Sequence, residues 1–243
     1  MQPVVRLRSA VCLLGRFPAL AGVDLEVASG EVVLLSGGNG AGKTTLLRLI
    51  AGLLPLHQGE AEVLGHDLAR NRTAHRRHVA FVGHETFCYD DLTARENLRF
   101  AARTTGASAS AADAALERVG LERCAAVSHA RLSAGQRRRL ALGVALAREP
   151  RLLLLDEPHA GLDADGRAVL DAVLGAAAGE DLTVLIASHE LDRTRSLASR
   201  EVVLTAGLAR AATERSEGAR RSNERPAGQR PGTPAVERKR PGR

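Results

Sequence analysis

Short apolar runs alternate along this chain with longer stretches of helical periodicity. The strongest runs consist mainly of Val, Leu and Ile, as in strands buried on both faces, and they cover residues 32–36, 152–156, 183–187 and 202–204. Weaker runs with strand character cover residues 4–7, 23–27, 61–63 and 79–82. Strands that alternate with helical patterns predict an α/β fold, in which helices cover a central parallel sheet.

The middle of the sequence has a different, helical pattern. Residues 92–127 are rich in alanine, and their larger apolar residues include Leu98, Leu116 and Val119. Small residues at 106–110 separate two helical stretches. We therefore expect a helical subdomain over residues 92–150, within a folded domain that covers residues 1–208.

The last part of the sequence, residues 209–243, has the composition of a disordered tail. It holds ten basic and four acidic residues, which accounts for the whole net charge of +6. It also contains four prolines and almost no large apolar residue, so it cannot bury enough surface to fold. The folded body is therefore neutral, and the basic charge does not predict a nucleic-acid partner.

Composition excludes several classes of protein. The longest apolar stretch, residues 140–147, is far shorter than the roughly 20 residues that span a bilayer. Neither a signal peptide nor a C-x-x-C pair is recognisable, so we expect a cytoplasmic protein with three reduced cysteines. One Tyr and four Phe are too few for a protein that binds nucleic acid by stacking bases.

A glycine-rich segment follows the strand predicted at residues 32–36. Residues 37–45 contain the pattern G-x-x-x-x-G-K-T, and an amphipathic helical pattern follows. Glycines let backbone N–H groups surround phosphate oxygens, and the N-terminus of the helix adds the positive end of its dipole. We expect Lys43 to reach the β- and γ-phosphates and Thr44 to offer its hydroxyl to Mg²⁺.

Two adjacent carboxylates end the strand predicted at residues 152–156. The period of two along a strand would point Asp156 and Glu157 in opposite directions, so we expect them to do different work. Asp156 would hold Mg²⁺, directly or through water. Glu157 would polarise or deprotonate the water that attacks the γ-phosphate.

Three further segments resemble the motifs of one family. Leu132-Ser133-Ala134-Gly135-Gln136 resembles the signature sequence of ABC-type ATPases, and it lies about twenty residues before Asp156. Ser188-His189-Glu190 resembles the segment that carries the switch histidine of that family, which contacts the γ-phosphate. Gly161-Leu162-Asp163 resembles the loop through which two such domains meet. The resemblance covers residues 4–208.

The resemblance implies a P-loop NTPase fold of ABC type, with a central parallel sheet, an antiparallel β layer and a helical subdomain. It also implies ATP and Mg²⁺ as bound groups and hydrolysis of ATP coupled to transmembrane transport. The residues expected to contact ATP are Phe17, Gly37, Gly38, Asn39, Gly40, Ala41, Gly42, Lys43, Thr44, Thr45, Ser133, Gly135 and Gln136. Lys43, Glu157 and His189 are the expected catalytic residues, and Thr44, Asp156 and Glu85 are the expected Mg²⁺ ligands.

The same resemblance implies two protein partners. One is a second copy in a homodimer, whose loop at residues 133–136 would cover the γ-phosphate held by residues 37–45. The other is a membrane-embedded permease, which would place the chain peripherally on the inner face of the cell membrane, with no span of its own and no nucleic acid.

Within the family, the chain looks most like the ATP-binding subunits of the haem exporter of cytochrome c maturation. The signature, Val82-Gly83-His84, Leu92-Thr93 and Glu96-Asn97-Leu98 carry this likeness. The alternatives are an ATP-binding subunit of another bacterial exporter, a soluble ABC-type ATPase that acts on ribosomes or DNA, and a nucleotide-binding scaffold without hydrolysis.

Two positions depart from the family pattern. The family carries a glutamine after the strand predicted at 79–82, where this chain has His84 and Glu85. We expect Glu85 to take its role, because Mg²⁺ prefers hard oxygen ligands. The aromatic residue that stacks on adenine is missing where Leu14 precedes Gly15, so we expect Phe17 to substitute, with Leu14 as the alternative and GTP still possible.

Four histidines, at positions 66, 75, 78 and 84, lie close together in the sequence. A metal or haem site would need neutral imidazoles, yet His75 and His78 lie among arginines that would repel a cation. The pattern therefore favours a solvated surface.

Overall fold

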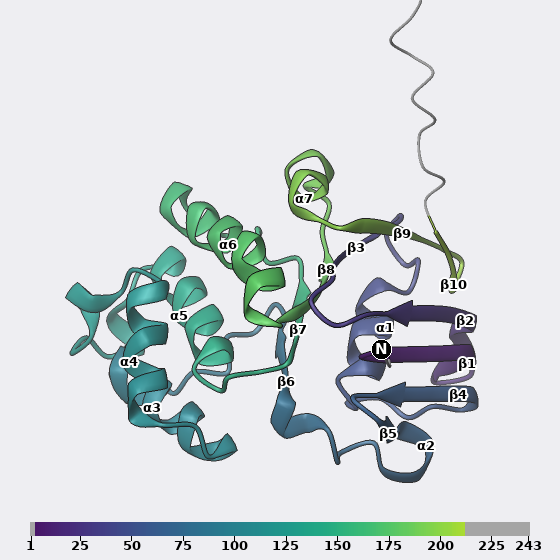
Figure 1. Cartoon of the computed structure of the whole chain (residues 1–243). Coiled ribbons are helices and arrows are strands. Elements are labelled where there is room, and N and C mark those ends of the chain that lie inside the picture. The colour runs from purple at the N-terminus through teal and green to yellow at the C-terminus, as the bar shows by residue number, and fades with distance from the viewer. Residues whose placement is uncertain (1–2, 212–243) are drawn as a thin grey trace, which may run out of the picture. The chain divides into compact units, whose positions relative to one another are not determined.

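A computed structural model describes residues 3–211 of the chain (Figure 1). The segment 212–243, and with it nearly all of the expected basic tail, lies outside the described residues.

The central sheet has six strands in the order β10-β9-β3-β8-β7-β6. Its strands are β3 (Val32–Ser36), β6 (Val79–Val82), β7 (Leu152–Asp156), β8 (Thr183–Ala187), β9 (Arg200–Thr205) and β10 (Leu208–Ala211). β9, β3, β8, β7 and β6 run parallel, and β10 pairs antiparallel with β9. The α/β prediction is confirmed, and β3, β6, β7 and β8 have the predicted bounds.

A second, antiparallel sheet is built mostly from the first third of the chain. Its order is β2-β1-β4-β5, with β1 (Val5–Leu14), β2 (Phe17–Val27), β4 (Gln58–Val63) and β5 (His66–Asp67). The first three strands are longer than the apolar runs that predicted them. Their added residues include exposed polar positions, because only one side of these strands faces the core.

The period of two along the central strands creates two separate cores. In β3, Val33 and Leu35 face a core shared with the antiparallel sheet, whereas Val32 and Leu34 face a core shared with helices. Helix α1 (Lys43–Ile50) fills the first core and lies between the two sheets (Figure 1). The glycine-rich segment before α1 is thus held from both sides.

Helices cover the other face of the central sheet (Figure 1). They are α3 (Ala94–Thr105), α4 (Ala109–Arg118), α5 (Ala134–Leu146), α6 (Ala164–Ala176) and α7 (Leu191–Leu197), with the short helix α2 (Leu68–Asn71) beside β5. Short 3₁₀ turns cover Arg76–His78, Glu122–Cys124, His129–Arg131 and Ala177–Glu180. α3, α4 and α5 occupy the region expected to be a helical subdomain.

Local sequence explains where two of these helices begin. The Thr93 side chain accepts the backbone N–H of Glu96, and the Glu96 carboxylate accepts that of Thr93. Ser133 and Gln136 form the same reciprocal capping box at the start of α5. Each box pairs two backbone donors that the first turn of a helix leaves free.

The described fold extends past the boundary expected at residue 208. β10 runs to Ala211, and just before it the Gly207 carbonyl accepts the Ala21 N–H of β2 at 2.8 Å. Backbone pairing holds this hairpin and needs no run of large apolar residues, so composition alone placed the boundary too early.

The interpretation of His75 as a solvated residue is wrong. Its side chain is fully buried, and its Nε2 lies 2.8 Å from the carbonyl oxygen of Ile50, the last residue of α1. The final carbonyls of a helix need partners from outside it, and the chain folds back beneath α1 to supply one. Burial lowers the pKa of His75 below its usual 6.5.

The described residues include no helix that is both long enough and apolar enough to cross a membrane.

Candidate functional site

A cavity of about 310 Å³ opens at the carboxyl end of the central sheet, beside the N-terminus of α1. Open α/β sheets bind their ligands at this edge. The cavity is lined by Leu14, Ala19, Asn39, Gly40, Ala41, Gly42, Lys43, Thr44, Thr45, Glu157 and His189. The glycine-rich segment, Glu157 and His189, which were predicted separately from the sequence, therefore meet at one cavity.

Two glycines of the loop are required by its backbone. Gly37 has φ 137° and Gly42 has φ 106°, a region that L side chains rarely adopt. A Cβ on Gly37 would lie 2.2 Å from the carbonyl oxygen of Leu204, and one on Gly42 would lie 2.7 Å from that of Ala19. The loop is therefore packed tightly against the neighbouring backbone.

The Lys43 ammonium folds over its own loop. Its Nζ donates to the carbonyl of Gly37 at 2.8 Å and to that of Gly38 at 3.2 Å. Lys43 is only 7% exposed. A buried ammonium needs a partner of opposite charge or several acceptors, and a phosphate at this loop would supply the charge.

The residues expected to hold Mg²⁺ lie together on two elements. Thr44, in the first turn of α1, donates its hydroxyl to Asp156 Oδ1 at the end of β7, with the oxygens 3.1 Å apart. A hydroxyl and a carboxylate are hard oxygen ligands of the kind that Mg²⁺ takes beside substrate phosphates. The donor set therefore fits this ion.

Glu157 follows β7 with an unusual backbone. Its φ is 50°, and its N–H donates to the Ala187 carbonyl at 2.8 Å. The Glu157 carboxylate accepts the His189 N–H at 3.2 Å and lies 3.3 Å from His189 Nε2. Because β7 ends at Asp156 and Glu157 has a left-handed φ, strand alternation does not extend to Glu157, which corrects the reason given for the two directions.

Arg138, which the sequence did not single out, supports this turn from α5. The guanidinium donates to the carbonyl of Glu157 at 3.1 Å and to the carbonyls of Gly83 and His84 in the loop after β6. Arg138 is 8% exposed, and burial lowers the pKa of its guanidinium. The sequence pattern alone cannot separate buried Arg138 from its neighbours, exposed Arg137 and part-buried Arg139.

The signature residues lie elsewhere. Ser133, Gly135 and Gln136 are absent from the lining of the cavity. Gly135 instead packs against the loop at 161–163, because a Cβ there would lie 2.8 Å from Asp163 Oδ2. Within one chain, the signature and the glycine-rich loop do not form a common site.

The residues expected to replace the adenine-stacking aromatic and the loop glutamine of the family differ in their placement. Leu14 lines the cavity, whereas Phe17, its partner across the β1–β2 hairpin, is 79% exposed and is not among the lining residues. Glu85 is exposed on the loop after β6 and does not line the cavity either. The roles of Phe17 and Glu85 stay predictions.

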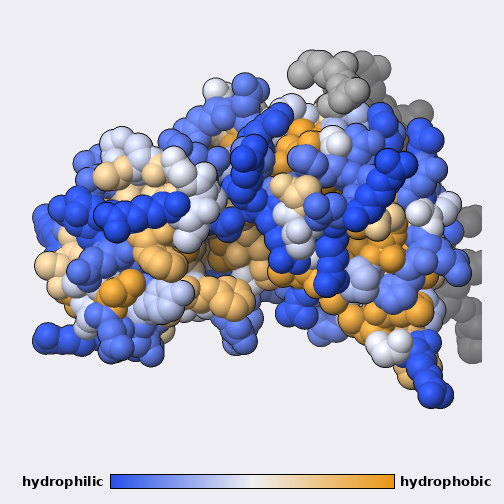
Figure 2. Space-filling model, turned by 90° about the horizontal axis from the view of Figure 1, so that it is seen from below, coloured by the Kyte–Doolittle hydropathy of each residue, from blue (hydrophilic) through white to orange (hydrophobic). Residues whose placement is uncertain are grey.

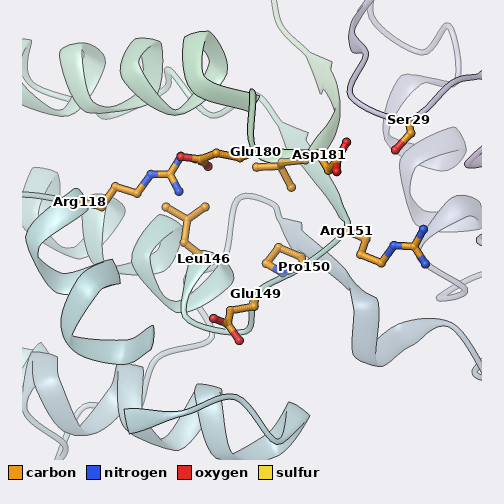
Figure 3. A pocket seen from close by; sticks show the side chains of 9 residues that line it. Ser29, Arg118, Leu146, Glu149, Pro150, Arg151, Glu180 and Asp181 are labelled. Atoms are coloured by element: carbon orange, nitrogen blue, oxygen red, sulfur yellow. The ribbon is translucent and has the colours of Figure 1, made fainter. Parts of the chain in front are cut away.

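A second cavity, of about 620 Å³, lies near the amino ends of β7 and β8 (Figure 3). Arg118 and Glu180 point toward each other there, with a 2.7 Å ion pair between Nη2 and Oε2. These two charges therefore pair with each other, and the cavity has no glycine-rich loop like the one beside Lys43.

Comparison with known proteins agrees with the geometry. A family model described as ABC transporter matches residues 20–160, more than half of the chain. The cytochrome c biogenesis ATP-binding export protein CcmA of Bordetella bronchiseptica is 42% identical over 187 residues, covering 75% of this chain and 83% of CcmA.

Relatives with other transport roles also match. The sulfate/thiosulfate import ATP-binding protein CysA of Bradyrhizobium diazoefficiens is 38% identical, over 84% of this chain and 61% of CysA. The daunorubicin resistance ATP-binding protein DrrA3 of Streptomyces coeruleorubidus is 39% identical, over 78% of this chain and 61% of DrrA3.

Solved structures share the fold. An ATP-binding subunit of an ABC transporter superposes with a TM-score of 0.79 at 28% identity, covering 86% of this chain and 88% of that one. A dimeric ATP-binding cassette bound to ADP and Pi superposes with a TM-score of 0.76 at 27% identity, covering 85% and 98%. The chain therefore belongs to the ABC transporter family, as an ATP-binding subunit similar to the CcmA proteins of cytochrome c biogenesis.

Proposed function

We propose that this chain binds ATP with Mg²⁺ and hydrolyses it to drive a haem exporter of cytochrome c biogenesis. The observation that carries the ATPase part is the meeting of Lys43, Thr44, Glu157 and His189 at one cavity, with Asp156 bonded to Thr44. A scaffold that only binds nucleotide would not need the Glu157–His189 pair, so its presence favours hydrolysis.

The glycine-rich loop would bind the triphosphate. Its N–H groups and the N-terminus of α1 attract negative charge, and Lys43 exchanges the carbonyls of Gly37 and Gly38 for phosphate oxygens. A bound Mg²⁺, held by Thr44 and Asp156, would neutralise charge on the phosphates. Leu14 offers an apolar surface for the base, which selects weakly between adenine and guanine.

Glu157 would act as the general base. Its carboxylate is held by residue 189 through both oxygens, at 3.2 and 3.3 Å, and it borders the cavity. In this position it can accept a proton from a water molecule that attacks the γ-phosphate. His189, which is itself half-exposed, can donate to the same phosphate.

A second copy would complete the site. The Ser133–Gln136 capping box presents the N-terminus of α5 away from the cavity of its own chain. That terminus suits the γ-phosphate bound by another copy, because helix N-termini attract anions. The dimeric cassette with ADP and Pi, which covers 85% of this chain, supports this arrangement.

The membrane partner would be a permease that docks beside Glu85. Three of the five aromatic residues of the chain, Phe87, Tyr89 and Phe100, are large exposed apolar side chains there. They line a groove of about 170 Å³ that reaches α3 and α5. The face seen from below carries separate apolar patches within a mostly hydrophilic surface (Figure 2). Docking would hold the chain at the inner face of the cell membrane.

The test of hydrolysis is Glu157→Gln. We expect it to bind ATP, to turn over at least ~100-fold more slowly, and to accumulate as a dimer with ATP and Mg²⁺. Glu149→Gln is a matched control. The φ of Glu149 is 48°, close to the 50° of Glu157, but Glu149 lies at the other cavity. A Glu157→Gln variant with normal turnover would contradict the assignment.

Haem export has its own test. Deleting the gene for this chain in its host should remove covalently attached haem from membrane c-type cytochromes, with restoration by wild type and not by Glu157→Gln. Normal cytochromes together with lost growth on sulfate would favour the import role of CysA instead.

A further inference from the structure

His159 is a buried histidine beside the catalytic carboxylate. It follows Pro158 at the start of the turn that leads to α6, and it is 3% exposed. Its Nδ1 lies 3.2 Å from the hydroxyl oxygen of Ser188, which is 1% exposed and follows β8. This hydrogen bond joins the loops that leave two neighbouring strands, β7 and β8.

Ser188 in turn fixes the residue that contacts Glu157. Its hydroxyl oxygen accepts the Glu190 N–H at 3.1 Å. The Ser188 side chain therefore bonds to the backbone just after His189. The His189 N–H then points at Glu157 Oε2. A rotation of the Ser188 hydroxyl away from His159 would leave the contacts between His189 and Glu157 to hold the turn at 188–190 to the loop after β7.

The remaining contacts of His159 lie in the segment that follows Glu157. Its carbonyl accepts the Leu162 N–H at 3.2 Å, in the loop at 161–163. Its Nε2 is buried with no hydrogen-bond partner. A core residue with no role in the site would be better apolar, because an unpaired buried nitrogen costs stability.

We propose that His159 is a positioning residue for ATP hydrolysis, which acts through Ser188 to hold His189 against Glu157. The inference rests on the proposed ATPase activity. Without the bond, the turn at 188–190 is held less firmly, and His189 orients the Glu157 carboxylate less well. The phosphate-binding loop is untouched, so the affinity for ATP should be kept while turnover falls.

The test compares His159→Ala, His159→Asn and Ser188→Ala. We expect His159→Ala to lower kcat about tenfold, the effect of one lost positioning hydrogen bond, with KM changed less than about twofold. Asn carries donor and acceptor atoms close to the position of Nδ1, so His159→Asn should recover most of kcat. The double variant His159→Ala/Ser188→Ala should be no slower than the slower single variant, because both remove the same bond.

Two matched controls separate positioning from general loss of stability. His75→Asn changes another buried histidine, which bonds a backbone carbonyl at the far end of α1. Ser196→Ala changes another serine hydroxyl, which donates to the Arg193 carbonyl on α7. We expect the first to lower Tm and neither to lower kcat.

A readout without ATP distinguishes failure of this proposal from failure of the proposed function. Hydrogen exchange of the His189 and Glu190 amides should be faster in His159→Ala and Ser188→Ala than in wild type and Ser196→Ala. Unchanged exchange, or an unchanged kcat in a folded His159→Ala or Ser188→Ala, would overturn the proposal. If wild type binds ATP without hydrolysing it, the ATPase assignment fails and the inferred catalytic role fails with it, while the exchange data still decide whether the bond holds the turn.

Discussion

Glu157 takes its direction from a backbone angle rather than from the strand before it. The left-handed φ of 50° is held by the Ala187 carbonyl on one side and Arg138 on the other. Such strain costs roughly 1–3 kcal/mol and persists where the surroundings fix it. In the proposed function, the two consecutive carboxylates, Asp156 and Glu157, have different tasks.

Glu85 provides a prediction at the level of one residue. If Glu85 joins the Mg²⁺ site when nucleotide is bound, Glu85→Gln should keep activity but need a several-fold higher Mg²⁺ concentration for half-maximal hydrolysis, because one negative ligand is lost. His84→Ala should leave that requirement unchanged, since imidazole is a poor Mg²⁺ ligand. Titration of Mg²⁺ at saturating ATP measures both, and the reverse pattern would exchange the two roles.

His75 provides a prediction about pH. Burial lowers its pKa, so the unfolded chain takes up a proton at a higher pH than the folded chain does. The contribution of His75 to the stability of the fold is therefore complete above pH 6.5, the pKa in the unfolded chain. It is lost as the pH falls toward the lower pKa of His75 in the folded chain. His78 and His159 shift in the same direction.

Urea unfolding at pH 8 and at pH 6 checks this expectation. Wild type should be less stable at pH 6, by up to about 1.4 kcal/mol per pH unit for each proton that only the unfolded chain binds. His75→Asn should be less stable at pH 8 by about 1–3 kcal/mol and should lose less on acidification. His84→Asn, at an exposed histidine, should match wild type, and a pH dependence unaltered by His75→Asn would contradict the account.

Among the elements, β10 links the end of the described fold to the site. The hairpin of β9 and β10 lies beside β2, and the Gly207 N–H at its turn donates to the Ala41 carbonyl in the glycine-rich loop at 3.1 Å. A strand that looked like the start of a tail therefore supports the phosphate-binding backbone.

Two truncations test the role of this hairpin. A chain that ends after Ala211 should keep ATPase activity within about twofold of the full chain, as for changes away from buried features. A chain that ends after Thr205 loses β10 and the Gly207 contacts, and it should have a lower Tm and weaker ATP binding. Thermal unfolding and ATP titration measure both, and equal behaviour of the two chains would show that the hairpin is dispensable.

For the whole molecule, the signature lies apart from the cavity, and the proposed function therefore needs a second copy to complete the site. The proposed function assigns the exposed aromatic groove to a different partner, the permease. Phe87 is 68% exposed at that groove, and Leu53 is 47% exposed elsewhere.

Phe87→Ala should weaken copurification with the permease about tenfold or more, as for an aromatic anchor at an interface, while the ATPase activity of the isolated chain is kept. Leu53→Ala should leave both unchanged. Detergent extracts of cells that express both proteins provide the measurement. Equal recovery of permease with both variants would exclude the aromatic groove as the docking surface.

The sequence by itself determined the elements whose signals are local. β3, β6, β7 and β8 are continuous apolar runs, and the phosphate loop is a fixed spacing of glycines before a lysine, so both can be recognised from neighbouring residues alone. The capped start of α5 at Ser133 is local in the same way.

Only the tertiary structure decided which polar groups are buried and what they bond. His75 under α1, Arg138 behind Glu157 and the His159–Ser188 bond each join residues at least 19 positions apart. A histidine or arginine inside the fold looks the same in the sequence as one on the surface. The folding of distant segments onto each other supplies the difference, since burial and bonding partners depend on contacts that the local pattern does not contain.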